Sequence, residues 1–101
     1  MKFAWDTNLV DVGNRNLIDE NGVPIILGNL VIQALLTQDK KEVDGKEKFA
    51  RYKLAIKIEH NDDIDISEAS FIKEIVGNIL TPLPVGRIWD LLDSPLPKLD
   101  S

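Results

Sequence analysis

The side chains best suited to chemistry lie beside the only histidine, His60. They form an acidic cluster of Glu59, Asp62, Asp63, Asp65 and Glu68. A histidine next to carboxylates is able to act as a general base. No residue in a nucleophile context lies near it in the sequence, and a lone histidine at a helix end typically interacts with the terminal carbonyl groups. The sequence therefore predicts no catalytic residue, and we expect a protein that is not an enzyme.

The same segment partly matches a calcium-binding loop. Asn61, Asp63 and Asp65 occupy the first, third and fifth ligand positions. Position six has Ile66 where such a loop needs Gly, and position twelve has Ile72 where it needs a bidentate Glu. The segment is better explained as a solvated turn followed by a helix with Ser67 as its cap. With no cysteine and no glycine-rich phosphate loop in the chain, we expect neither a metal site nor a cofactor.

A basic segment precedes the acidic cluster. Residues 39–57 hold seven basic and four acidic side chains, a net +3, whereas the whole chain carries −5. The basic members are Lys40, Lys41, Lys46, Lys48, Arg51, Lys53 and Lys57. A solvated helix face beside an acidic loop explains this distribution, and the alternative is a bipolar surface that steers a charged protein partner. The negative total makes nucleic acid an unlikely partner, since phosphate binding depends on Lys and Arg.

Both ends of the chain carry apolar residues that suit a partner surface. Trp5 has few apolar neighbours in sequence, and exposed aromatics are favoured interface anchors. The alternative is that Trp5 folds back onto the core. Near the other end, Leu96 and Leu99 lie in a proline-containing tail that is able to dock in extended form on a partner, although a frayed terminus is the commoner outcome.

The apolar spacing predicts four helices. Leu27, Leu30, Val31, Ala34 and Leu35 give a helical stripe over about 27–37, and the stripe from Ile72 to Leu80 is the strongest in the chain. Thr81–Pro84 ends that helix, and Pro84 suits the start of a fourth one through Leu92. Before the helices, residues 16–26 predict a β-hairpin around Asn21-Gly22, with Pro24 restricting its second strand to an edge. No internal repeat is evident.

The second helix has a rival interpretation. Asp44 followed by Glu47 matches a helix cap, and the segment to Glu59 is rich in good helix formers. However, residues 52–58 alternate between apolar and polar side chains, which is typical of a strand. We favour the helix.

The predicted fold is therefore mainly α, borderline α+β: four short helices with an N-terminal β-hairpin in one domain, residues 1–94, and an extended tail, residues 95–101. A chain of 101 residues fits one domain. The expected core consists of Leu27, Leu30, Val31, Leu35, Phe49, Leu54, Ile58, Phe71, Ile72, Ile75, Val76, Ile79, Val85, Ile88, Trp89 and Leu92.

Composition narrows the class further. The chain is 44% hydrophobic and 29% charged, as in globular proteins and unlike disordered ones. No apolar run approaches the ~20 residues of a membrane span, and the first residues lack the apolar stretch of a signal peptide. We therefore expect a cytoplasmic protein without a membrane partner.

A series of short segments within residues 17–93 invites comparison with known proteins: Leu27-Gly28, Ala34-Leu35, Gly45-Lys46-Glu47-Lys48, Arg51-Tyr52, Leu54-Ala55, Ile72-Lys73 and Val85-Gly86-Arg87-Ile88. In this series the chain resembles small, mostly uncharacterised proteins encoded by tailed phages and prophages. The resemblance implies expression inside an infected bacterium and no known enzymatic activity. It assigns no functional residues.

The leading hypothesis is a small non-enzymatic protein that acts by binding another protein, as an assembly factor or an inhibitor of a host machine. Its candidate partner contacts are Trp5, Lys46, Arg51, Lys53, Lys57, Leu96 and Leu99. A second hypothesis is a nucleic-acid-associated protein that uses the basic residues of 40–57, and a third is a structural component that self-assembles into a homo-oligomer.

Overall fold

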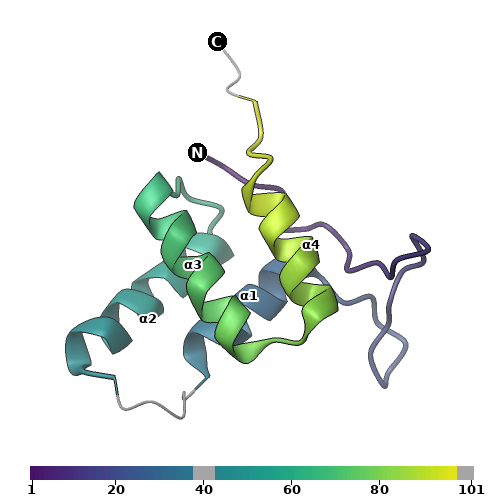
Figure 1. Cartoon of the computed structure of the whole chain (residues 1–101), viewed down its shortest axis with the longest axis horizontal. Helices are drawn as coiled ribbons and strands as arrows, with labels where there is room; N and C mark the ends of the chain where they lie inside the picture. The colour runs from purple at the N-terminus through teal and green to yellow at the C-terminus, as the bar shows by residue number, and fades with distance from the viewer. Residues whose placement is uncertain (38–42, 98–101) are drawn as a thin grey trace.

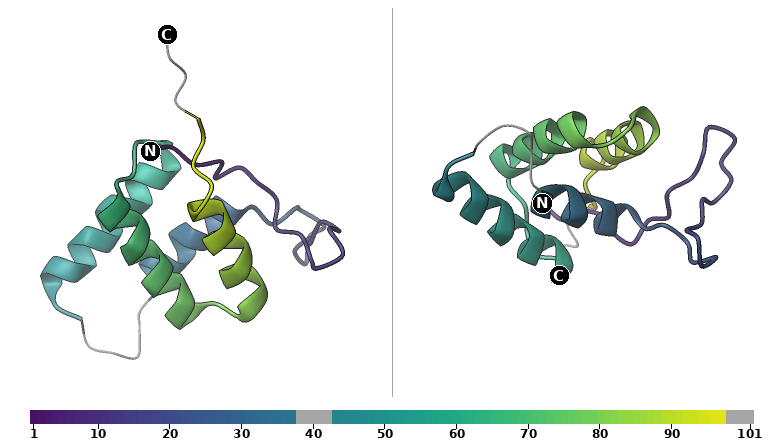
Figure 2. Two further views of the ribbon diagram at one scale, coloured as in Figure 1. Left: turned by 45° about the horizontal axis from the view of Figure 1, so that its top comes forward. Right: turned by 90° about the horizontal axis from the view of Figure 1, so that it is seen from below.

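Four helices pack in two layers. The computed structural model describes residues 1–37 and 43–97, and its helices are α1 (Leu27–Leu36), α2 (Gly45–Glu59), α3 (Ile66–Ile79) and α4 (Pro82–Leu92) (Figure 1). Seen from below, α1 and α2 form one layer and α3 and α4 the other (Figure 2). Helix α1 is central, because it contacts each of the other three. None of the helices in the described part of the chain has the length and apolar character needed to cross a membrane. The mainly α prediction is confirmed.

Local capping fixes where α2 and α3 begin. The Asp44 carboxylate accepts a hydrogen bond from the Glu47 backbone N–H at 2.8 Å, as the sequence predicted. For α3 the cap is Asp65 and not Ser67. Asp65 accepts from the Glu68 N–H at 2.7 Å while Glu68 accepts from the Asp65 N–H at 3.0 Å, which is a reciprocal capping box. The box places Ile66 inside the helix, and it explains two members of the acidic cluster structurally.

The helical interpretation of α2 is confirmed, so the strand alternative for residues 52–58 is wrong. Its buried positions are Arg51, Leu54, Ala55 and Ile58, which follow helical spacing. Helix α4 begins at Pro82, two residues before the predicted start, since a proline in the first turn costs no hydrogen bond.

The N-terminal β-hairpin over residues 16–26 is not shown. The described residues form three isolated antiparallel bridges, Asn8 with Ile26, Val10 with Asn16 and Ile18 with Pro24, and no strand. The predicted turn is present, with Gly22 at φ 77°. Pro24 has no N–H to continue a ladder. The next residue, Ile25, bonds to two segments: its N–H donates to the Leu17 carbonyl, and its own carbonyl accepts from the Leu9 N–H.

The segment around Leu9 belongs to an eight-residue repeat, which was not predicted from the sequence. The Leu9 N–H donates to the Ile25 carbonyl, the Leu17 N–H to Leu9 and the Ile25 N–H to Leu17, so three residues eight positions apart close a ring of hydrogen bonds. The two intervening loops are built alike. The carboxylates of Asp11 and Asp19 each accept two backbone N–H groups, and the positive φ values fall at Asn14 and Gly22, again eight apart. These loops project from the helices (Figure 1).

The core lies between the helices and the first nine residues. Phe3, Val31, Ile64, Ile72, Val76 and Ile88 are almost wholly buried. Three residues predicted for the core are not in it: Phe49 is 58% exposed, Trp89 is 42% exposed, and Val85 is half-buried outside the core cluster. The core instead includes Phe3, Trp5 and Leu9 from the N-terminal segment, none of which was predicted for it.

Candidate protein-binding site

Helix α2 presents an apolar face to solvent. Phe49, Tyr52 and Ile56 are spaced by three and four residues, so they share one side of the helix. They lie on the side opposite its buried positions, and their exposed fractions are 58%, 52% and 36%. We call these three residues, together with the exposed Lys46 and Lys53, the α2 outer face. A contiguous exposed apolar surface with a polar border is typical of an interaction site.

The aromatic rings of this face are arranged in contact with one another. The rings of Phe49 and Tyr52 stack with centroids 6.2 Å apart and an angle of 25° between their planes. The Lys53 ammonium lies 5.4 Å from the centre of the Phe49 ring, a cation–π distance. The α2 outer face therefore combines aromatic area with positive charge.

The basic residues of α2 divide into two groups. Arg51 is 6% exposed and donates to the Glu47 carboxylate at 3.3 Å, and Lys57 donates to the Glu68 carboxylate at 2.8 Å. The hydrogen bond that Lys57 donates to Glu68 raises the pKa of Lys57 above its ordinary 10.5. Arg51 and Lys57, both predicted partner contacts, thus pair with carboxylates of the same chain. Lys46, Lys48 and Lys53 remain on the surface, whereas Lys40 and Lys41 lie outside the described residues.

A shallow groove of about 430 Å³ runs alongside this face, between α2 and α3. Ala50 and Leu54 of α2 and Phe71 of α3 provide its apolar lining, and Lys53 stands at its border with the α2 outer face. The projecting side chains of the α2 outer face and the neighbouring groove together form an uneven apolar surface of the kind that binds a partner helix.

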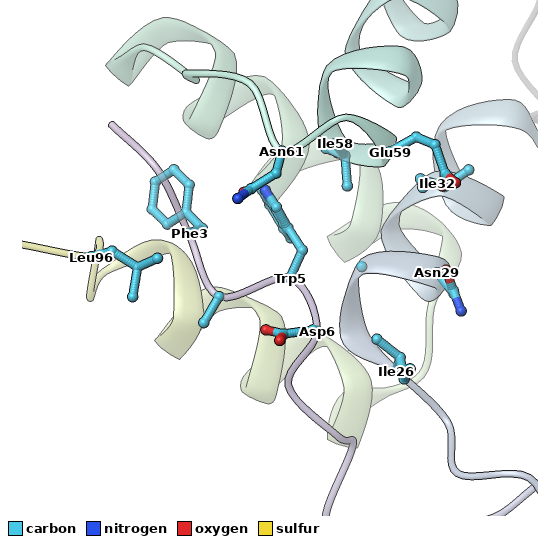
Figure 3. A pocket seen from close by; sticks show the side chains of 12 residues that line it. Phe3, Trp5, Asp6, Ile26, Asn29, Ile32, Ile58, Glu59, Asn61 and Leu96 are labelled. Atoms are coloured by element: carbon cyan, nitrogen blue, oxygen red, sulfur yellow. The ribbon is translucent and has the colours of Figure 1, made fainter.

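A second hollow, the Trp5 groove, brings together residues from both ends of the chain. It has a volume of about 590 Å³ and is lined by Phe3, Ala4, Trp5, Asp6, Ile26, Gly28, Asn29, Ile32, Ile58, Glu59, Asn61 and Leu96 (Figure 3). Of the predicted contacts, it unites Trp5 with Leu96. Leu96 is attached by its backbone N–H to the Lys2 carbonyl at 2.8 Å, and Leu99 lies outside the described residues.

Trp5 is a core residue and not an exposed anchor. It is 6% exposed, and its ring lies 5.4 Å from that of Phe3. The segment is fixed by a hydrogen bond from the Gly28 N–H to the Trp5 carbonyl at 2.8 Å. Gly28 is required there, because a Cβ at this position would lie 2.8 Å from that carbonyl oxygen. The close approach of this backbone to helix α1 explains why a tryptophan with few apolar neighbours in sequence is nevertheless buried.

The acidic cluster forms no metal centre in the part of the chain that the structure describes, where no three His, Asp or Glu side chains converge suitably. His60 is the exposed C-terminal cap residue of α2, and its backbone N–H donates to helix carbonyls. Asp65 and Glu68 serve the capping box, and Glu68 also binds Lys57.

The sequence analysis missed Phe49, Tyr52 and Ile56 as surface residues. Their signal was present in the spacing: they fall outside the stripe of Leu54, Ala55 and Ile58, and one helix can bury only one side in a two-layer fold. Searches for a matching protein family, for a curated relative and for a solved structure of similar fold found no match to this chain.

Proposed function

We propose that this chain is a non-enzymatic protein that acts by binding another protein through the α2 outer face. The observation that carries the proposal is the exposure of Phe49, Tyr52 and Ile56 on one side of a helix whose other side is already packed. Removing apolar side chains from water is favourable, and a partner would cover these three.

The partner's chemistry follows from the charges around that area. Lys46 and Lys53 lie beside the apolar residues. Of the carboxylates of the helix, Glu47 is paired with Arg51, and the exposed Glu59 lies one turn beyond Ile56 at the C-terminal end of the face. A partner segment with carboxylates at its edges complements this arrangement. The proposed partner is an acidic amphipathic helix, with its apolar side chains against Tyr52 and in the groove between α2 and α3. The resemblance to phage proteins adds the proposal that this partner belongs to the phage or its bacterial host.

The test is photo-crosslinking in bacterial cells. Tyr52 is replaced by p-benzoylphenylalanine, and the same amino acid at Glu74, an exposed position on α3, is the control. We expect an adduct from position 52 only, in which mass spectrometry identifies an acidic segment with helical apolar spacing. The adduct should weaken when Lys46 and Lys53 are both changed to Gln.

Three outcomes would contradict the proposal. They are no adduct above the control, an adduct with a basic segment, and an adduct between two copies of the chain. The last would favour the self-assembling component. Nucleic-acid binding with a steep salt dependence would favour the basic-segment hypothesis instead, which the internal pairing of Arg51 and Lys57 weakens.

A further inference from the structure

The indole N–H groups of the two tryptophans differ: that of Trp89 has a hydrogen-bond partner, and that of Trp5 has none among the described residues. Trp89 is 42% exposed, and its Nε1 donates to the Lys73 carbonyl at 3.2 Å. Trp5 is 94% buried by the same measure, and its Nε1 has no hydrogen-bond partner among the described residues. A buried donor without a partner is unfavourable and uncommon in native structures. This donor belongs to a residue that lines the Trp5 groove.

One exposed side chain, that of Asn61, lies next to this donor (Figure 3). The nitrogen end of the Trp5 indole is directed toward Asn61 (Figure 3). Asn61 is exposed, and it lies two residues after the end of α2 with a backbone φ of 54°. Trp5 Nε1 itself is buried, so an acceptor atom from outside the chain reaches it only if the exposed Asn61 side chain changes its rotamer.

The groove has the size and charge of a peptide site. Its volume of about 590 Å³ lies in the range of ligand-binding clefts. Ile26, Ile32 and Leu96 give it apolar walls, and the exposed Asp6 and Glu59 stand at its edge. Among the described residues that line it, none is Lys, Arg or His. The site therefore combines an apolar lining with negative charge, whereas the α2 outer face combines apolar side chains with the positive charge of Lys46 and Lys53.

We infer that the Trp5 groove binds an extended, basic peptide segment of a partner protein. A backbone carbonyl of the segment accepts the hydrogen bond from Trp5 Nε1, a Leu-sized side chain fills the apolar hollow, and two Lys or Arg side chains pair with Asp6 and Glu59. This site is separate from the α2 outer face and does not depend on the function proposed for it.

The test follows the indole N–H resonance of Trp5 by NMR, assigned with a Trp89→Phe variant. The probe is the peptide acetyl-Lys-Leu-Ala-Leu-Lys-amide, and its counterpart with Glu in place of Lys is the control. We expect the basic peptide to shift the Trp5 resonance saturably and to leave that of Trp89 in place. The double variant Asp6→Asn/Glu59→Gln should bind about tenfold more weakly, since two surface ion pairs are lost.

A matched control distinguishes this from a general charge effect. Glu20→Gln/Glu74→Gln removes two exposed carboxylates that do not line the groove, and it should leave the affinity unchanged. The inference is overturned if the Trp5 resonance does not move up to millimolar peptide, if the acidic peptide shifts it equally, or if both double variants bind alike. A shift with protein concentration alone would also overturn it, because the occupant would then be a second copy of the chain.

Discussion

Two pairs of aromatic residues in this molecule have opposite fates. Phe3 and Trp5 lie in an irregular N-terminal segment and are 1% and 6% exposed. Phe49 and Tyr52 lie in a regular helix and are 58% and 52% exposed. Regular structure therefore does not decide burial here. The N-terminal pair closes the helical core, whereas the pair on α2 contributes little to it and is available to a partner.

The largest expected effect comes from truncating one ring of each pair. Phe3→Ala should lower the free energy of unfolding by about 3–5 kcal/mol, because it leaves a cavity in the core. Phe49→Ala should change it by less than about 0.5 kcal/mol, since the ring is mostly in water and Ala favours the helix. Urea denaturation of both variants measures the difference. Equal destabilisation by the two changes would contradict the claim that Phe3 stabilises the core and Phe49 does not.

The next effect concerns the contact that holds the N-terminal pair in place. In Gly28→Ala the new methyl group meets the Trp5 backbone, so we expect a loss of about 1–3 kcal/mol in the free energy of unfolding. Gly86→Ala is the matched control, because a Cβ there meets nothing within 4 Å and the position is inside α4. That variant should gain up to about 1 kcal/mol from helix propensity. Thermal unfolding of the two proteins compares them, and a stable Gly28→Ala variant would show that Trp5 is not held as described.

The sequence predicted the structure correctly where strong local signals determine it. The helix cap at Asp44 correctly outweighed the strand-like alternation of residues 52–58, and the apolar stripe from Ile72 onward correctly predicted α3. It failed where burial depends on distant parts of the chain. Nothing near Trp5 indicates that it meets Gly28, and nothing near Leu9 indicates that it pairs with Leu17 and Ile25. The equivalent positions of Asp11 and Asp19 are the one sequence signal of the eight-residue repeat. The signal is weak, because backbone groups form the ring of hydrogen bonds and the repeated segments have few side chains in common.

The basic residues of the candidate site were predictable from the sequence in part, and its exposed aromatic rings were not. Lys46 and Lys53 were identified from charge alone, and the structure keeps both on the surface. Arg51 and Lys57 were identified by the same reasoning, but whether a basic residue pairs internally depends on where Glu47 and Glu68 fall on the helices. The exposed rings were missed because a periodic apolar residue is ordinarily assigned to the core.

The smallest expected effect is a pH dependence in the N-terminal loops. The backbone N–H of Arg15, with that of Gly13 and the Arg15 guanidinium, holds the pKa of Asp11 below its ordinary 3.8 against an opposing effect of burial. The stability contributed by the ionised carboxylate is therefore present above pH 3.8 and is lost as the pH falls through the lower, folded value. The melting temperature of Asp11→Asn should lie slightly below that of the parent near neutral pH, and the two should converge in acid. A constant difference at all pH values would exclude the carboxylate as its source.

The most direct test of the account is a binding titration with the segment crosslinked from position 52. The parent chain is compared with Phe49→Ala/Tyr52→Ala, whose fold is monitored by its melting temperature. If the α2 outer face is the partner surface, the double variant should lose about a hundredfold or more in affinity, as for two central interface residues, while its melting temperature stays within a few degrees of the parent. Unchanged affinity in the folded variant would contradict the central claim.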